Sequence, residues 1–213
     1  MAIFYQHNIN QHTRLGIWQL QEPEQFFLQK VPLKKEVTHP HKRLQHLGGR
    51  YLLTQLFADF PLEEIVIADT RKPYLENETY HFSISHCGNF AAAIASHTER
   101  VGIDIETIDE KIERVSHKFI HQKEAAHLQQ LLSTPLSISE LAFKTIIWSC
   151  KEPIFKWYGA GKIDFKNHMQ WNGHFTNNNS IMHLQFEFFK QQPVVLLLSA
   201  QKIESQIVSW LHN

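Results

Sequence analysis

The sequence lacks several features that mark particular classes of protein, and each absence argues against one class. Its only two cysteines, Cys87 and Cys150, argue against a disulfide-rich secreted scaffold. The longest apolar run, Phe90–Ala95, is far shorter than the roughly 18 residues of a membrane-spanning helix. The 21 Lys and Arg balance the 21 Asp and Glu, so net charge gives no case for nucleic acid. We therefore expect a cytoplasmic protein that binds neither membranes nor nucleic acid.

The patterning indicates an α+β fold. With 213 residues and 43% hydrophobic composition, the chain is long enough to bury a core without disulfides. Helical spacing and strand-like runs alternate along it. The spacing predicts helices over 40–60, 113–132 and 139–158, and strands over 80–85, 90–96, 100–106 and parts of 162–211. We expect two halves, residues 1–98 and 99–213, each a small antiparallel sheet with packed helices.

Two acidic side chains share one face of a predicted strand. In the hexapeptide Val101–Glu106 the apolar Ile103 and Ile105 alternate with Asp104 and Glu106. Neighbouring carboxylates repel each other unless a cation lies between them, and Mg²⁺ prefers such oxygen ligands. The alternative is a solvated strand end.

A second acidic side chain is paired with a lysine on a predicted helix. Glu152 and Lys156 are four residues apart, so they share one helix face. An ordinary surface ion pair has the same spacing, but the surrounding residues are apolar and aromatic. Pro153 lies between the two and is expected to kink the helix.

Two further features favour an anionic ligand. Ser85 and His86 stand at a predicted strand end, where they can donate hydrogen bonds to an anion or form a simple turn. Between Lys30 and Arg50 there are six basic residues against one acid, Glu36. This excess suits a phosphate-rich ligand or an acidic partner, although some of these residues are expected to be solvated.

Five segments of the sequence can be compared with known families: GRYLL (Gly49–Leu53), RKPYL (Arg71–Leu75), HFSISHCG (His81–Gly88), VGIDIE (Val101–Glu106) and WSCKEPIFKWYG (Trp148–Gly159). Together these segments resemble the Sfp-type 4'-phosphopantetheinyl transferase superfamily. The last two of the five matching segments carry the signature of that family.

The resemblance implies a fold and an activity. The fold would be two pseudosymmetric α+β halves with a ligand cleft between them. The enzyme, a holo-(acyl carrier protein) synthase in the broad sense, would transfer the 4'-phosphopantetheine arm of coenzyme A to a serine of an acyl or peptidyl carrier protein and release 3',5'-ADP. Two halves in one chain would let a monomer suffice. Mg²⁺, or Mn²⁺, would be held by Asp104, Glu106 and Glu152.

The resemblance also implies roles for individual residues. Lys156 would neutralise charge on the bridging phosphate, and Glu152 or a metal-bound water would take the proton of the attacking serine. The other expected coenzyme A contacts are Arg43, Arg50, Lys72, Ser85, His86 and Lys151, with Lys42 competing for the role of Arg43. The segment Asp109–Leu132 is a candidate docking surface for the carrier, through Lys118, Phe119, Ile120 and Lys123.

Two other functions are compatible with the same residues. A degenerate family member could bind coenzyme A or a carrier protein without catalysis, and Pro153 is the feature that favours it. A Mg²⁺-dependent phosphohydrolase or nuclease could use the same carboxylates for water attack on a phosphodiester.

Overall fold

The chain forms two compact units. The structure, a computed structural model, describes residues 3–33, 37–134, 138–190 and 192–213. Unit 1 comprises Met1–Ile105 with His212–Asn213, and unit 2 comprises Glu106–Leu211. The division therefore falls inside strand β7 (Val101–Thr107), whereas the sequence placed it between residues 98 and 99.

Unit 1 is built on a four-stranded antiparallel sheet with the order β1-β2-β6-β5. The short strands β3 and β4 form a separate antiparallel pair. The strands are β1 (Tyr5–Asn8), β2 (Thr13–Gln19), β3 (Ile65–Ile67), β4 (Pro73–Leu75), β5 (His81–Cys87) and β6 (Phe90–Ser96), and the helices are α1 (Glu24–Leu28), α2 (Pro40–Leu56) and η1 (Leu62–Glu64).

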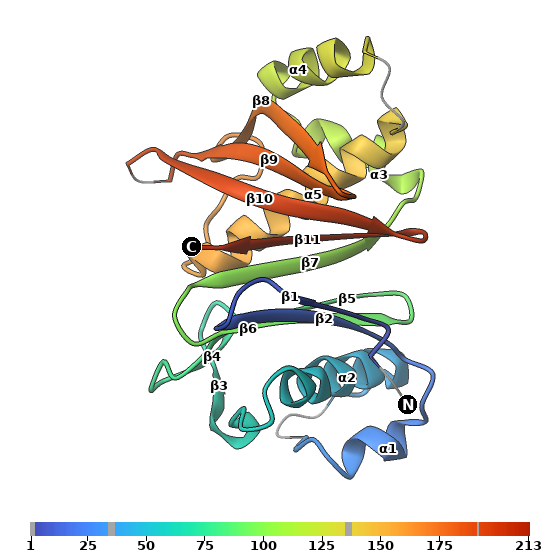
Figure 1. Cartoon of the computed structure of the whole chain (residues 1–213), viewed down its shortest axis with the longest axis vertical. Helices are drawn as coiled ribbons and strands as arrows, with labels where there is room; N and C mark the ends of the chain where they lie inside the picture. Colours follow the sequence, from blue (N-terminus) through green and yellow to red (C-terminus); the bar gives the residue numbers. More distant parts are fainter. Residues whose placement is uncertain (1–2, 34–36, 135–137, 191) are drawn as a thin grey trace. The chain divides into compact units, whose positions relative to one another are not determined.

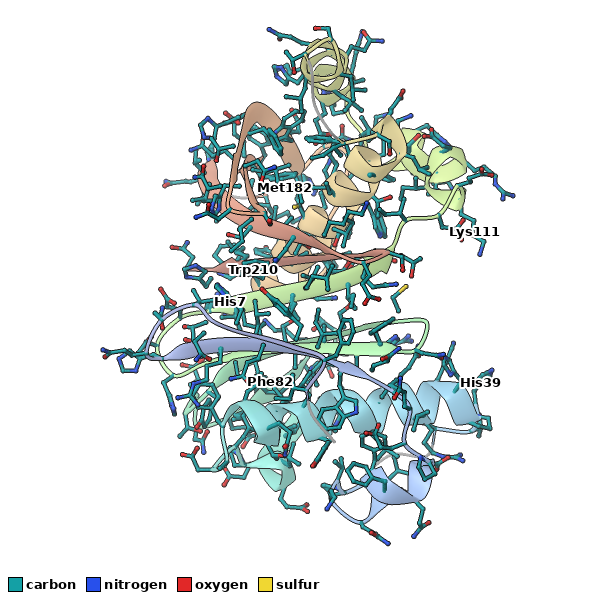
Figure 2. The ribbon with its side chains drawn as sticks, turned by 45° about the vertical axis from the view of Figure 1, so that its right-hand side comes forward. His7, His39, Phe82, Lys111, Met182 and Trp210 are labelled. Atoms are coloured by element: carbon teal, nitrogen blue, oxygen red, sulfur yellow. The ribbon has the colours of Figure 1, made fainter. Side chains whose placement is uncertain are left out.

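Helix α2 covers one face of this sheet (Figure 1). His39 is its N-cap (Figure 2), and Pro40 lies in the first turn. Proline is tolerated there because the backbone N–H groups of the first turn have no acceptor within the helix. Small side chains bring the helix close to the sheet, since β6 presents a run of buried alanines. On the helix, a Cβ at Gly49 would lie 2.5 Å from Ile84 Cγ2 of β5. Small residues on both the helix and the sheet therefore allow the two to pack closely.

Unit 2 contains most of a five-stranded sheet with the order β7-β11-β10-β9-β8, in which only the last two residues of β7 belong to this unit. Its other strands are β8 (Met169–Asn178), β9 (Ile181–Phe188), β10 (Val194–Ile203) and β11 (Gln206–His212), and its helices are α3 (Lys111–Val115), η2 (Ser116–Lys118), α4 (Gln122–Leu132) and α5 (Glu140–Tyr158). The α+β class with antiparallel sheets is thus confirmed. No helix of the described residues is long and apolar enough to cross a membrane.

The core of unit 2 lies between α5 and the sheet (Figure 1). Strand β9 alternates strictly, with Met182, Leu184, Phe186 and Phe188 buried (Figure 2 labels Met182). Helix α5 buries apolar residues at helical spacing, from Phe143 to Ile154. The buried faces of β9 and α5 meet in one apolar layer, so the opposite face of α5 is directed toward solvent.

Pro153 does not break α5, which continues from Glu140 to Tyr158. A proline cannot donate to the carbonyl four residues earlier, here that of Ser149. The Ser149 carbonyl instead accepts a hydrogen bond from Ser209 Oγ of β11, and the two hydroxyls lie 2.8 Å apart. The sheet therefore supplies the donor that the helix lacks.

This compensation predicts a coupled effect of two substitutions. Ser209→Ala should lower the free energy of unfolding by about 1–3 kcal/mol, because it leaves the buried Ser149 carbonyl without that donor. In a Pro153→Ala background the loss should be smaller, since the new amide can donate to Ser149. Urea denaturation measures both. Ser205→Ala, in the exposed turn before β11, is the control; equal losses in both backgrounds would contradict the interpretation.

Candidate functional site

Unit 1 contains a basic pocket of about 840 Å³ beside α2. We call it the α2 pocket. Its lining includes no Asp or Glu among the described residues. The basic and histidine side chains in the lining are His39, Lys42, His46, Arg50, Arg71 and His86, and the apolar part comes from Pro32, Val37, Leu62, Ile65, Ile67, Pro73 and Ile84.

The basic side of the α2 pocket is one face of a helix. Positions 39, 42, 46 and 50 are separated by three or four residues, so their side chains share a face. The sequence analysis assigned Arg50 to the ligand and offered Lys42 as an alternative to Arg43, and the helical spacing was a signal that could also have found His39 and His46. Lys34 and Lys35, of the same basic stretch, lie outside the described residues.

Arg50 lies in an environment that favours an anion. Burial lowers the pKa of its guanidinium. Its Nη1 donates to His46 Nδ1 over 3.0 Å, which orients the guanidinium in the pocket. A desolvated cation is stabilised by a nearby negative charge, so the chemistry of this pocket suits a phosphate.

Arg43 is placed differently from the expectation. Its Nε and Nη2 donate to the Glu24 carboxylate over 2.5 and 2.9 Å, and its Nη1 donates to the Val37 carbonyl. The hydrogen bond to Glu24 raises the pKa of Arg43. Arg43 therefore joins α1 to α2, and the neighbouring Lys42 lines the α2 pocket in its place.

The basic turn before β4 contributes a different residue from the one expected. Arg71 and Pro73 line the α2 pocket, whereas Lys72 between them does not. Burial lowers the pKa of the Lys72 ammonium, and the charge of Arg100 lowers it further. Arg71 is thus the basic residue of this turn that lines the α2 pocket, and the role expected of Lys72 at the ligand stays a prediction.

Ser85 and His86 point to opposite faces of β5, because successive side chains alternate in a strand. His86 is exposed and lines the α2 pocket. Ser85 is buried and its Oγ donates to Asp104 Oδ1 over 2.7 Å. Of the two, only His86 is placed for a ligand in this pocket; Ser85 orients the predicted metal ligand Asp104.

In unit 2 the predicted catalytic residues share one partly exposed face of α5. Trp148, Glu152 and Lys156 follow one another at intervals of four residues. Trp148 Nε1 donates to Glu106 Oε1 over 3.0 Å. This hydrogen bond joins the end of β7 to the α5 face that carries Glu152.

The predicted metal ligands are divided between the units, with Asp104 in unit 1 and Glu106 and Glu152 in unit 2. Across the described ranges, no group of three or more His, Cys, Asp or Glu side chains is arranged to hold a metal ion. The three-carboxylate site therefore stays a prediction. Its donor set fits the group, since carboxylate oxygens are the ligands that Mg²⁺ and Mn²⁺ prefer.

Lys151 is not placed to contact a phosphate. Its side chain is fully buried, and its Nζ donates to Glu124 Oε2 over 2.8 Å and to the carbonyls of Phe119 and Phe165. Burial lowers the pKa of Lys151 to about 8, with Glu124 acting in the opposite direction. The expectation that Lys151 binds coenzyme A is corrected, because three protein acceptors already use its three donors.

The candidate docking segment is also only partly as expected. Phe119 is 1% exposed, because its ring packs on Trp148, and it is not available to a partner. Lys118 and Lys123 are exposed. Ile120 lines a second pocket, of about 630 Å³, between η2, α4 and the start of α5.

Comparison with known proteins confirms the resemblance. Residues 100–204 match the family model of the 4'-phosphopantetheinyl transferase superfamily. The 4'-phosphopantetheinyl transferase gsp of Aneurinibacillus migulanus is 27% identical over 150 residues, which cover 69% of this chain and 57% of the relative. The chain thus spans somewhat more than half the length of that protein.

The pairing of Arg43 with Glu24 predicts a pH dependence. The hydrogen bond from Arg43 lowers the pKa of Glu24, so the carboxylate stabilises the fold above its unfolded-state pKa. This contribution is lost as the pH falls through the lower folded-state pKa. We expect Glu24→Gln to be less stable than the wild type at neutral pH and equally stable in acid.

Urea denaturation across a pH series checks this expectation. The exposed Glu76→Gln serves as the control for loss of a surface charge. A stability difference between Glu24→Gln and the wild type that stays constant from neutral pH to acid would show that the Arg43 pair is not its source.

Proposed function

We propose that the chain transfers the 4'-phosphopantetheine arm of coenzyme A to a serine of a carrier protein and releases 3',5'-ADP. The observation that carries this proposal is the family match over residues 100–204, which contain Asp104, Glu106, Glu152 and Lys156. The site geometry adds independent support from each unit.

The α2 pocket fits the nucleotide end of coenzyme A. Its basic face, with Arg50 and His86, suits phosphate groups, and its apolar side, with Ile65 and Pro73, suits a planar base. A pocket without acidic residues in its described lining also avoids repelling a polyanionic substrate.

The chemistry at α5 follows from charge and position. The carrier serine Oγ would attack the phosphorus that bears the pantetheine arm, and its proton would pass to Glu152. The bond from that phosphorus to the bridging oxygen breaks, and 3',5'-ADP leaves with the electron pair. Lys156 would stabilise the negative charge that develops there. A divalent ion at Asp104, Glu106 and Glu152 would supply further neutralisation of the pyrophosphate.

The carrier would dock on unit 2 beside η2 and α4. The exposed Lys118 and Lys123 suit an acidic helix, and Ile120 in the second pocket offers an apolar contact. Phe119 is left out of this surface because it is buried.

The proposed activity predicts a mass change in the partner. An apo carrier protein incubated with this protein, coenzyme A and Mg²⁺ should gain one phosphopantetheine arm, measured by intact-mass spectrometry. Glu152→Gln should abolish the gain, because the side chain keeps its shape but loses its basicity.

The same assay separates the alternatives. Coenzyme A binding without any gain across several unrelated carriers would favour the non-catalytic binding module. Cleavage of a labelled oligonucleotide with Mg²⁺, and no transfer, would favour the phosphohydrolase or nuclease.

The assignment of the α2 pocket predicts different effects of two arginines. Arg50→Gln should weaken binding of adenosine 3',5'-bisphosphate by about 10- to 100-fold, the equivalent of one charge-assisted hydrogen bond. Arg43→Gln should change it little, because Glu24 already binds that guanidinium. Isothermal titration calorimetry measures both dissociation constants. Equal losses, or a larger loss for Arg43, would refute the assignment.

A further inference from the structure

A buried ion pair lies directly behind the proposed catalytic face of α5. Lys151 and Glu124 are both 0% exposed, and their Nζ and Oε2 atoms are 2.8 Å apart. Replacing such a pair by apolar residues is often neutral or stabilising. Stability alone is therefore a weak reason for two charges in this core, and the hydrogen bonds that they direct need a separate explanation.

The pair connects five segments of unit 2. Lys151 of α5 donates to the Phe119 carbonyl over 2.5 Å and to the Phe165 carbonyl over 3.0 Å. Glu124 of α4 also accepts from the backbone amide of His121, over 2.7 Å, and from that of Trp171 in β8, over 2.8 Å. The ammonium uses all three donors, and both carboxylate oxygens accept hydrogen bonds.

The two residues whose carbonyls bind Lys151 also enclose Trp148. The Phe119 ring centroid is 5.1 Å from that of Trp148, and the Phe165 ring stacks on it at 5.3 Å and 24°. Trp148 Nε1 in turn donates to Glu106 Oε1. A continuous path of contacts therefore runs from the buried ammonium through the aromatic residues around Trp148 to a predicted metal ligand.

We propose that Lys151 and Glu124 are positioning residues, which fix Phe119 and Phe165 around Trp148 and so hold Glu106 in place beside the α5 face of Glu152. As far as it concerns catalysis, this inference rests on the proposed transferase function. Neither residue touches substrate, so their effect is on the geometry of the groups that do.

Two variants test the proposal. Glu124→Gln keeps the side-chain shape but removes the charge, and Lys151→Met/Glu124→Gln removes the ammonium without leaving a buried charge. In both we expect kcat to fall about 10- to 100-fold, with a smaller change in KM for coenzyme A, because the α2 pocket, proposed to bind the nucleotide end of coenzyme A, is in unit 1.

A second readout does not depend on activity. In ¹⁵N-labelled protein each of the five tryptophans gives one indole N–H resonance, and Trp148→Phe assigns the one from Trp148. In both variants the Trp148 resonance should shift or broaden, since its hydrogen bond to Glu106 loosens. Met182→Ala, which opens a cavity in the same core, is the control for lost stability and should leave this resonance and kcat unchanged.

The outcomes separate the two proposals. Folded variants with wild-type kcat and an unmoved Trp148 resonance would overturn the positioning role. Equal losses of kcat in Met182→Ala would also overturn it, because destabilisation alone would then explain the effect. A wild-type protein that modifies no carrier would refute the transferase function, and the Trp148 resonance would still decide whether the ion pair positions Glu106.

Discussion

The geometry of unit 2 depends on one constraint: two adjacent charged residues of α5 must point in different directions. Successive helical residues are rotated by about 100°, so Lys151 enters the core while Glu152 stays on the partly exposed face. A buried ammonium is tolerated only where acceptors surround it. Those acceptors come from α4, the end of η2 and the segment before β8, which must all assemble around this one atom.

Much of the fold could be predicted from local patterns. The helix from Pro40 follows from its apolar spacing, and β6 occupies the predicted range 90–96. The predicted helix over 113–132 is wrong, because the chain instead forms α3, η2 and α4. Its break places the Phe119 carbonyl on Lys151, a residue more than thirty positions later. A contact so distant in sequence leaves no periodic signal.

The site shows the same division between local and tertiary information. Residue types and motif order predicted the class of chemistry, but not which cation faces the ligand. Lys42 lines the α2 pocket, whereas the next residue of the helix, Arg43, binds Glu24. Likewise His86 lines the pocket, whereas its neighbour in the strand, Ser85, binds Asp104. Such choices depend on which face packs against the core, and Glu24 lies nineteen residues from its partner. Motif matching alone cannot resolve single positions of this kind.

The charges of unit 1 are divided so that one arginine is neutralised within the protein and another is left for a ligand. Glu24 binds Arg43 outside the α2 pocket, while the described lining of that pocket carries Arg50 and Arg71 without a carboxylate. Burial of Arg50 disfavours its charged form, as its lowered pKa indicates. Because this cation is partly removed from water, it favours binding of an anion. A bound phosphate would restore the stabilisation that water no longer provides.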